Sequence, residues 1–250
     1  MRKKMVDIHV HILPGVDDGS PDPEISLEMA EQAVRSGVRH LVMTPHCNIP
    51  EMFDNYNDDD VIRSRMEKFR RQVKEAGIPL ELYTGMEVFG TSEVPFLLKE
   101  GRLMTINDTG YLLIEFPFAG SPDYATDILS DICSMGYTPI VAHPERYEYV
   151  QKDPGLVDYW IRMGCGTQIN KGSLLKRFGR LPFSCASWLL EEGMVSCVAS
   201  DAHHCEWRTT YMDEVRMVLA QEYGDDYADF LTRVNPERIL EGKELLWPIA

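Results

Sequence analysis

Short apolar runs alternate with longer amphipathic stretches along the whole chain. Such alternation is typical of βα units arranged around a mainly parallel sheet. The length of 250 residues suits a single α/β barrel domain, so one domain spanning residues 1–250 is expected. Seven apolar runs are predicted to be strands: 5–9, 40–44, 80–86, 111–115, 138–142, 166–169 and 195–200.

Helices are predicted in the stretches between these strands. The first is well marked, because Asp22 precedes Pro23 and apolar residues then recur at helical spacing up to Gly37. A second, at about 59–76, carries a basic face that we interpret as a solvated surface. Further helices are predicted at 92–99, 124–135, 154–163, 182–191 and 206–221, with a short final one opening at 235–237.

Histidines and carboxylates gather where the apolar runs end. His9 and His11 lie two residues apart, and alternation along a strand points both side chains the same way. In a barrel of parallel strands, groups at the carboxyl ends of the strands collect on one face. Nine residues share this placement and together predict one metal site: His9, His11, Asp18, His46, Glu87, Glu115, His143, Asp201 and His203.

The types of side chain restrict the metal. Imidazole nitrogen and carboxylate oxygen together suit Mn, Fe or Zn better than Ca or Mg. The six cysteines form no CxxC pair, and we expect them to be reduced and structural, including Cys47 and Cys205 beside two candidate ligands. His40, at the start of a strand, and His204 are expected to lie outside the site.

Three questions stay open at the level of the residues. Asp17 and Asp18 compete for one ligand role, and either could instead cap the following helix. Asp7 could orient a metal-binding histidine or simply be solvated. The segment 52–60 could form a mobile rim over the site, although an ordinary loop is the favoured interpretation.

Composition excludes some classes of function. The formal net charge of −15 argues against an extended nucleic-acid surface, since phosphate backbones are bound by clusters of Lys and Arg. Residues 1–5 are positively charged but no apolar stretch follows them, so neither a signal peptide nor a membrane span is predicted. A cytoplasmic protein without membrane insertion is therefore expected.

Six segments carry a resemblance to a known family: 7–11 (DIHVH), 16–19 (VDDG), 44–46 (TPH), 112–116 (LLIEF), 142–147 (AHPERY) and 199–203 (ASDAH). The chain resembles the PHP (polymerase and histidinol phosphatase) superfamily over nearly its whole length. It is most similar to the bacterial manganese-dependent protein-tyrosine phosphatases that regulate capsular and exopolysaccharide synthesis. The resemblance implies a distorted (β/α)7 TIM-like barrel of the PHP type, three metal ions, with Mn²⁺ the first choice, and hydrolysis of phosphotyrosine on a partner tyrosine autokinase.

The resemblance also implies roles for residues. All nine candidates become metal ligands, with Asp18 chosen over Asp17 and Glu87 as the bridging carboxylate. Arg146 and Arg208 match arginines that contact the phosphate, although 204–207 departs from the Gly- or Asn-containing loop expected before Arg208. The four carboxylates and three divalent ions would together carry a formal charge of about +2, which suits a phosphate substrate.

The expected chemistry is direct attack on phosphorus by a metal-bound hydroxide, without a covalent phosphoenzyme. Neither Cys165 nor Cys205 opens a CxxxxxR loop of the kind that cysteine-dependent phosphatases need. The alternative is a histidinol phosphatase or another small phosphomonoesterase with the same ions. A nuclease and a catalytically idle binding module are further alternatives, which the acidity and the complete ligand set respectively disfavour.

Overall fold

The structure, a computed structural model, describes residues 4–247. Its strands pair in parallel and form two sheets, with orders β1-β2-β4 and β3-β5-β6-β7-β8-β9. The α/β class is confirmed. The strands are β1 Met5–Val10, β2 Val38–Met43, β3 His46–Cys47, β4 Glu81–Thr84, β5 Glu87–Phe89, β6 Tyr111–Glu115, β7 Thr138–Ala142, β8 Gly166–Asn170 and β9 Cys197–Ala199.

The two sheets are linked into a ring. β2 is followed by β3, and β4 by β5, after breaks of two residues, so β3 and β5 are short second strands that lie beyond the predicted ranges 40–44 and 80–86. Pro45 and Gly85 lie at the two breaks. Proline has no N–H to donate to a ladder, and a Cβ at Gly85 would lie 2.7 Å from the side chain of Val42. The strand predicted over 80–86 therefore ends earlier, at Thr84.

Main-chain hydrogen bonds join the other edges of the two sheets. The N–H of Asp201, just after β9, donates to the carbonyl of His9 in β1 at 2.9 Å. The N–H of His11 donates back to the carbonyl of Ala202, also at 2.9 Å. These bonds bring the first and last strands of the chain side by side, and with them two sets of candidate ligands.

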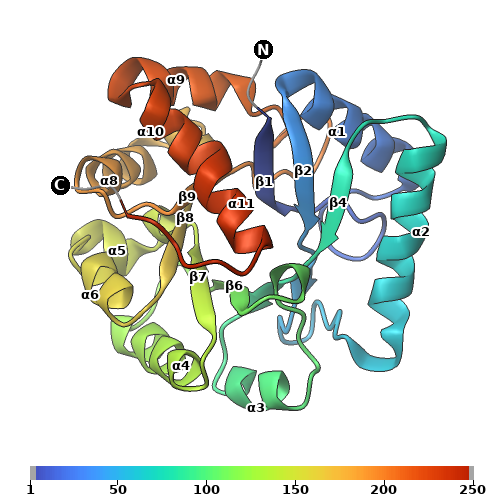
Figure 1. Cartoon of the computed structure of the whole chain (residues 1–250). Helices are drawn as coiled ribbons and strands as arrows, with labels where there is room; N and C mark the ends of the chain where they lie inside the picture. Colours follow the sequence, from blue (N-terminus) through green and yellow to red (C-terminus); the bar gives the residue numbers. More distant parts are fainter. Residues whose placement is uncertain (1–3, 248–250) are drawn as a thin grey trace.

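Helices surround the strands on the outside (Figure 1). The first begins and ends as predicted, because the side chain of Asp22 accepts hydrogen bonds from two N–H groups of the first turn and Gly37 ends it at a φ of 105°. The helices are α1 Pro23–Ser36, α2 Val61–Glu75, α3 Val94–Lys99, α4 Pro122–Ser134, α5 Glu148–Lys152, α6 Leu156–Arg162, α7 Lys171–Leu174, α8 Arg180–Glu191, α9 Asp213–Tyr223, α10 Asp225–Asp229 and α11 Asn235–Leu240.

The predicted helix over 206–221 is wrong in its first half, since α9 begins only at Asp213. The segment before it is bound by side chains rather than by its own helical bonds. The ammonium of Lys171 donates to the carbonyls of Thr209 and Tyr211, and the hydroxyl of Thr210 donates to the carbonyl of Met29. These contacts hold the segment in a non-helical path beside the carboxyl end of β9.

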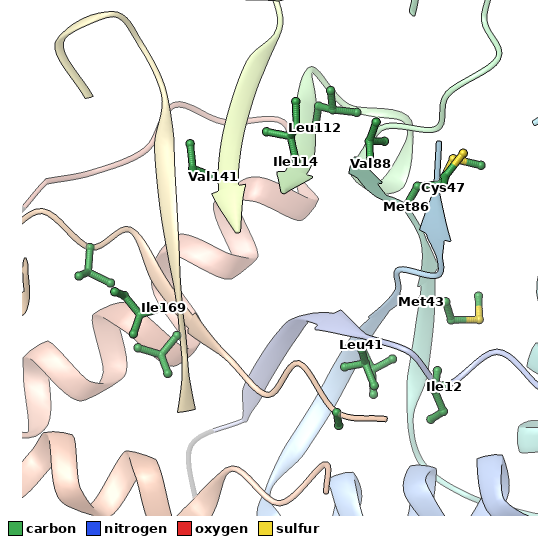
Figure 2. Close-up of a cluster of buried hydrophobic side chains, with 14 of the residues drawn as sticks. Ile12, Leu41, Met43, Cys47, Met86, Val88, Leu112, Ile114, Val141 and Ile169 are labelled. Carbon is green, nitrogen blue, oxygen red and sulfur yellow. The ribbon is translucent and has the colours of Figure 1, made fainter. Parts of the chain in front are cut away.

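Two apolar clusters fill the fold, one on each face of the strands. Alternation explains the division: Leu113 and Ile140 belong to the inner cluster, whereas Leu112, Ile114 and Val141, labelled in Figure 2, belong to the outer one. Three apolar residues from outside the strands complete the inner cluster: Ile106, before β6, and Ile239 and Leu240 of α11. α11 crosses the ring in Figure 1. Apolar packing thus fills the amino-terminal end of the ring, and the polar groups lie at the carboxyl end.

Among residues 4–247, no helix combines the length and the hydropathy that crossing a membrane would require.

Candidate metal centre

A bulge in β1 turns its histidines toward the ring. Between Asp7 and Val10 the register with β2 slips, so that extra chain on β1 lies opposite the two steps from Leu41 to Met43. A bulge of this kind re-aims side chains that strict alternation would send to opposite faces. Ile8 therefore joins the inner apolar cluster while His9 also faces the ring, where its Nε2 lies 3.2 Å from Nε2 of His11.

The protons of these two imidazoles are assigned by their neighbours. Nδ1 of His9 lies 2.7 Å from Oε1 of Gln168, and Nδ1 of His11 lies 2.9 Å from a carboxylate oxygen of Asp17. Both partners are acceptors, so in the neutral rings each Nδ1 carries the proton and each Nε2 carries a lone pair. Two lone pairs facing each other at this distance repel unless a proton or a metal ion lies between them, and Nε2 atoms oriented by a bonded Nδ1 are typical of metal-binding histidines.

Glu87 lies at the centre of the cluster. It is 1% exposed, and its Oε2 lies 3.0 Å from Nε2 of both His9 and His11 and 3.2 Å from Nδ1 of His46. None of these contacts has the geometry of a hydrogen bond, so this buried oxygen has no such partner among the described residues. A carboxylate oxygen surrounded in this way fits a divalent ion that several ligands share.

The remaining candidates complete the cluster. Nε2 of His143 lies 3.0 Å from Oε1 of Glu87, and Oδ1 of Asp18 lies 3.5 Å from Nε2 of both His46 and His203. The structure thus brings all nine predicted residues together. Among the described residues, three overlapping groups have ligand atoms within 4.8 Å of one another: His11, Asp18, His46 and His203; His9, His11, Glu87 and Asp201; and His46, Glu87 and Glu115.

The two neighbouring aspartates have different positions. Asp18 offers a carboxylate oxygen to the cluster, whereas Asp17 turns to the ring of His11 and to the main-chain N–H of His46, at 3.0 Å. Neither caps α1, which is capped by Asp22.

Burial and the neighbouring carboxylates have opposite effects on the pKa values of the imidazoles. Burial disfavours the protonated form of His9, but the carboxylates of Glu87 and Asp201 outweigh it and raise the pKa to about 9. In the same way Glu87 and Glu115 raise the pKa of His46 to about 10 against its burial. Burial, helped by His11, lowers the pKa of His203 to about 4. In the metal-free protein the cluster therefore retains protons that a metal ion has to displace.

Both predicted arginines reach the cluster through Asp201. Nη2 of Arg208 lies 2.5 Å from Oδ1 of Asp201, and Nη1 of Arg146 lies 3.4 Å from Oδ2. The guanidinium of Arg146 lies between two aromatic rings, 4.5 Å from the centroid of Phe118 and 4.6 Å from that of Phe178. A Cβ at Gly172 would come within 2.5 Å of the Phe178 ring, so glycine makes room for this aromatic clamp.

Three residues of the cluster have left-handed backbone, namely His143 with φ 36°, Asp201 with φ 49° and Arg208 with φ 47°. For residues other than glycine such conformations cost about 1–3 kcal/mol each and persist where the surrounding structure imposes them, commonly at functional sites.

The structure also gives the positions of His40 and His204, which were expected to lie outside the site, and of Asp7, whose role was open. Nδ1 of His40 lies 3.0 Å from the hydroxyl of Tyr83, away from the cluster. The ring of His204 stacks on Trp207. Asp7 is fully buried and accepts from the main-chain N–H of Ser200 at 3.0 Å, so the solvated alternative is wrong, and its bonds go to main chain rather than to a histidine ring.

The cysteines lie outside the candidate ligand groups. All six cysteines are free, and neither Cys47 nor Cys205 belongs to a candidate ligand group among residues 4–247.

The segment 52–60 lies against the cluster: the ring of Phe53 stacks on His46 with the ring centroids 5.8 Å apart, and the amide of Asn55 donates to the carbonyl of His46. The segment therefore contacts the cluster through His46.

Sequence reasoning missed the residues that hold the ligands in place. Gln168 bonds His9 and also donates to Asn170 at 2.8 Å, which in turn donates to Asp201 at 2.5 Å. Gln168 and Asn170 lie two residues apart in β8, and Asn170 ends the strand, so the alternation that aligned His9 with His11 could have found these two amides as well. No comparable signal marks Phe118 and Phe178, which meet Arg146 only in the folded chain.

The fold and the cluster define a parallel α/β protein with a site suited to divalent metal ions. Comparison with known proteins agrees and is more specific. The chain belongs to the CpsB/CapC family of capsular polysaccharide synthesis, whose sequence model matches residues 5–241.

Relatives and solved structures extend the comparison. The tyrosine-protein phosphatase YwqE of Bacillus subtilis is 36% identical over 241 residues, covering 96% of this chain and 93% of the relative. CpsB of Streptococcus pneumoniae, also named a tyrosine-protein phosphatase, is 34% identical over 94% of this chain and 98% of its own. A crystal structure from work on these two proteins, described as unique metal-dependent tyrosine phosphatases, matches with a TM-score of 0.91 at 36% identity over 98% of this chain and 97% of that one.

A phosphotriesterase from Mycobacterium tuberculosis shares the fold alone. Its TM-score is 0.62 at 11% identity, over 97% of this chain and 95% of that one.

Proposed function

We propose that this protein is a metal-dependent protein-tyrosine phosphatase that uses divalent ions held by the nine clustered side chains. The observation that carries the proposal is the convergence of three ligand atoms: Nε2 of His9 and Nε2 of His11 lie 3.2 Å apart, and each lies 3.0 Å from the unpartnered Oε2 of Glu87. The names of the relatives supply the reaction, since both YwqE and CpsB are called tyrosine-protein phosphatases.

The three overlapping groups support three ions. Glu87 belongs to two of the groups, which suits a bridging carboxylate, while His11 and His46 are likewise shared. His143 would complete the group of His46, Glu87 and Glu115, because its Nε2 lies 3.0 and 3.8 Å from the two carboxylates. Mn²⁺ is the first choice, with Fe or Zn as alternatives that the same donors accept. Asp18 is the proposed ligand, and Asp17 orients His11.

Bound divalent ions supply a nucleophile from water near neutral pH and neutralise charge on the phosphoryl group. The chain's own residues position the substrate. Arg146 and Arg208 are proposed to leave part of their contact with Asp201 and to donate to the non-bridging phosphoryl oxygens. The aromatic clamp restricts the guanidinium of Arg146, so less entropy is lost when phosphate binds. The phenol leaving group, with a pKa near 10, needs little acid catalysis.

The proposed substrate is a phosphotyrosine protein, in the first place a bacterial tyrosine kinase that acts in capsule or exopolysaccharide synthesis. This assignment rests on the family and on the names of the relatives. We also propose that the protein is cytoplasmic and that residues 1–250 form one domain. A formal net charge of −15 continues to argue against nucleic acid as the substrate.

The test compares two phosphomonoesters. Metal-stripped protein is assayed for phosphate release from a phosphotyrosine peptide and from histidinol phosphate, with and without added Mn²⁺. Turnover that requires the metal and favours the peptide is the expected result. Preference for histidinol phosphate would move the protein to the small-molecule branch, and no turnover of either with Mn²⁺, Fe²⁺ or Zn²⁺ would contradict a phosphatase function.

A further inference from the structure

A hollow of about 800 Å³ lies at the amino-terminal ends of β2 and β4, away from the candidate metal centre at the carboxyl ends of the strands. Its walls come mainly from the chain before β1, the start of β2, the start of β4 and the last turns of α2 (Figure 1). A volume of about 300–1,000 Å³ is common for sites that bind small molecules. The hollow is therefore large enough to hold such a ligand.

Four permanent cations and one carboxylate line this hollow. The cations are Lys4, Arg39, Arg70 and Lys74, and the carboxylate is Glu81. The whole chain has 40 acidic and 25 basic residues, so its composition by itself would favour an acidic wall. Like charges that lie close together repel one another, and an anion between them removes the repulsion. The walls therefore favour a negatively charged occupant.

Three of the four cations have no carboxylate partner. Lys4, Arg39 and Lys74 form no ion pair with any carboxylate of the described residues. The two lysines are exposed, whereas Arg39 is half-buried and is held by main chain. Its Nη1 donates to the carbonyls of Val34 and Val38 at 2.8 and 2.7 Å. This guanidinium is thus fixed in place while its charge stays unpaired.

The fourth cation and the carboxylate both have partners. Nη1 of Arg70 lies 2.5 Å from a carboxylate oxygen of Glu67, and its Nε donates to the carbonyl of Leu82. Oε2 of Glu81 lies 3.3 Å from Nδ1 of His40. With Arg70 balanced by Glu67, the single charge of Glu81 faces three unpaired cations. The walls therefore keep a net positive charge.

The walls also include apolar and aromatic groups. Ile78, Leu80 and Leu82 line the hollow together with the ring of Tyr83. A few charged groups among apolar side chains are typical of sites for small molecules, in which the charges fix the orientation of the ligand. The walls thus accept a molecule that carries its charges at one end and an uncharged ring at the other.

We propose that this hollow is a binding site for a small polyphosphate anion, either a nucleoside diphosphate or a free polyphosphate. Phosphoryl oxygens accept hydrogen bonds from guanidinium and ammonium groups, and these charge-assisted bonds are strong. The unpaired cations come from the chain before β1, from β2 and from α2, so they favour a ligand with more than one phosphoryl group. Arg39 is already held by two carbonyls and loses little freedom on binding. The inference does not depend on the proposed phosphatase function.

The first experiment measures binding to the full-length, Mn²⁺-loaded protein by calorimetry. The probes are ADP, AMP, tripolyphosphate and hexaglutamate, each at low and at physiological ionic strength. We expect ADP or tripolyphosphate to bind about 10-fold more tightly than AMP, because further phosphoryl oxygens reach further cations, and salt should weaken the binding. The measurement is repeated after removal of the metal, and binding at this hollow should persist.

Reversal of two charges in the walls tests the location. Lys4→Glu combined with Lys74→Glu should weaken binding of the tighter probe by about 10–100-fold, since two charged donors are replaced by acceptors. Both lysines are exposed and unpaired, so the fold is expected to survive, and thermal unfolding checks this. Lys68→Glu combined with Lys99→Glu is the matched control, because both lysines are exposed and neither lines the hollow.

The outcomes distinguish the ligands. Tighter binding of ADP than of tripolyphosphate would identify a nucleotide, and the reverse would identify free polyphosphate; both support the site. If hexaglutamate binds and neither phosphate compound does, the hollow receives an acidic protein segment and the proposal is wrong. It is also wrong if no probe binds, if removal of the metal abolishes binding, or if the Lys4 and Lys74 reversals bind as tightly as the control pair.

Discussion

Asp17 accepts a hydrogen bond from Nδ1 of His11 at 2.9 Å, and its carboxylate also accepts from the main-chain N–H of His46 at 3.0 Å. One carboxylate thus contacts two proposed ligands, one just after β1 and one in β3, without offering an oxygen to the candidate ligand groups of the described residues. Asp18, one residue later, offers its oxygen to His46 and His203. Adjacent, chemically identical side chains therefore have separable roles, and substitution can tell them apart.

Asp17→Asn should weaken metal binding without abolishing activity. Loss of a carboxylate that orients a ligating histidine typically costs about 10–100-fold in metal affinity. We expect the activity of the metal-stripped variant to need correspondingly more Mn²⁺ and then to recover, as measured by titrating Mn²⁺ against phosphate release. Asp18→Asn should keep a deficit at saturating metal. The reverse pattern, with Asp18→Asn rescued and Asp17→Asn not, would exchange the two roles.

Phe178→Leu should lower kcat/KM for a phosphotyrosine substrate by about 3–30-fold, since an arginine over an aromatic ring gains about 0.5–2 kcal/mol. The ring lies 4.6 Å from the guanidinium of Arg146, which we propose contacts the phosphate. Phe183→Leu is the control, because Phe183 lies 4.5 Å from the ammonium of Lys176 in an equivalent contact away from the metal centre. Equal losses in the two variants, with unchanged metal content, would show that the clamp has no special role.

Lys171→Met should destabilise the protein and also slow turnover. Lys171 is 2% exposed, and its ammonium donates to the carbonyls of Thr209 and Tyr211 in the segment that carries Arg208. Two carbonyls would lose a charged donor, at a cost of about 1–3 kcal/mol, or about 2–4 °C in Tm per kcal/mol for a chain of this size. Thermal unfolding and kcat are measured together, with Lys152→Met as the exposed control. A normal kcat in Lys171→Met would show that the segment carrying Arg208 does not need this anchor for catalysis.

The stability of the metal-free protein should fall as the pH rises above neutrality. His9 and His46 have pKa values of about 9 and about 10 in the folded protein, held up by Glu87 against burial, compared with about 6.5 in an unfolded chain. The stabilisation is therefore complete below pH 6.5 and is lost as the pH passes through 9 and 10.

Bound metal should remove this pH dependence, because the ion binds neutral imidazole and takes the place of the protons. Tm is measured from pH 6.5 to 10 for the chelated and the Mn²⁺-loaded protein, and saturating metal should also raise Tm at each pH. A flat profile for the chelated protein would contradict the assignment of protons to the cluster.

The class of fold and the location of the site could be predicted from local pattern. Short continuous runs of apolar residues form buried parallel strands, and side chains at the ends of parallel strands meet at one edge of the sheet. That rule was enough to select Glu115 at the end of β6, His143 after β7 and Asp201 after β9, which the structure brings into one cluster.

The sequence-based predictions missed or misplaced the structural details that depend on distant segments of the chain. Three kinds of detail depend on contacts with other parts of the chain. They are the strand breaks at Pro45 and Gly85, the late start of α9 at Asp213 and the bulge before Val10.

By itself the sequence determined which side chains meet: a parallel α/β architecture with nine potential ligands at the carboxyl ends of its strands. Only the tertiary structure decided what each of them does. It made Asp17 a partner of His11 and Asp18 a neighbour of His46 and His203, and it enclosed Arg146 between two rings. The reason is physical: periodicity along the chain sets the direction of a side chain, but lone pairs, protons and distances are set by atoms from remote segments.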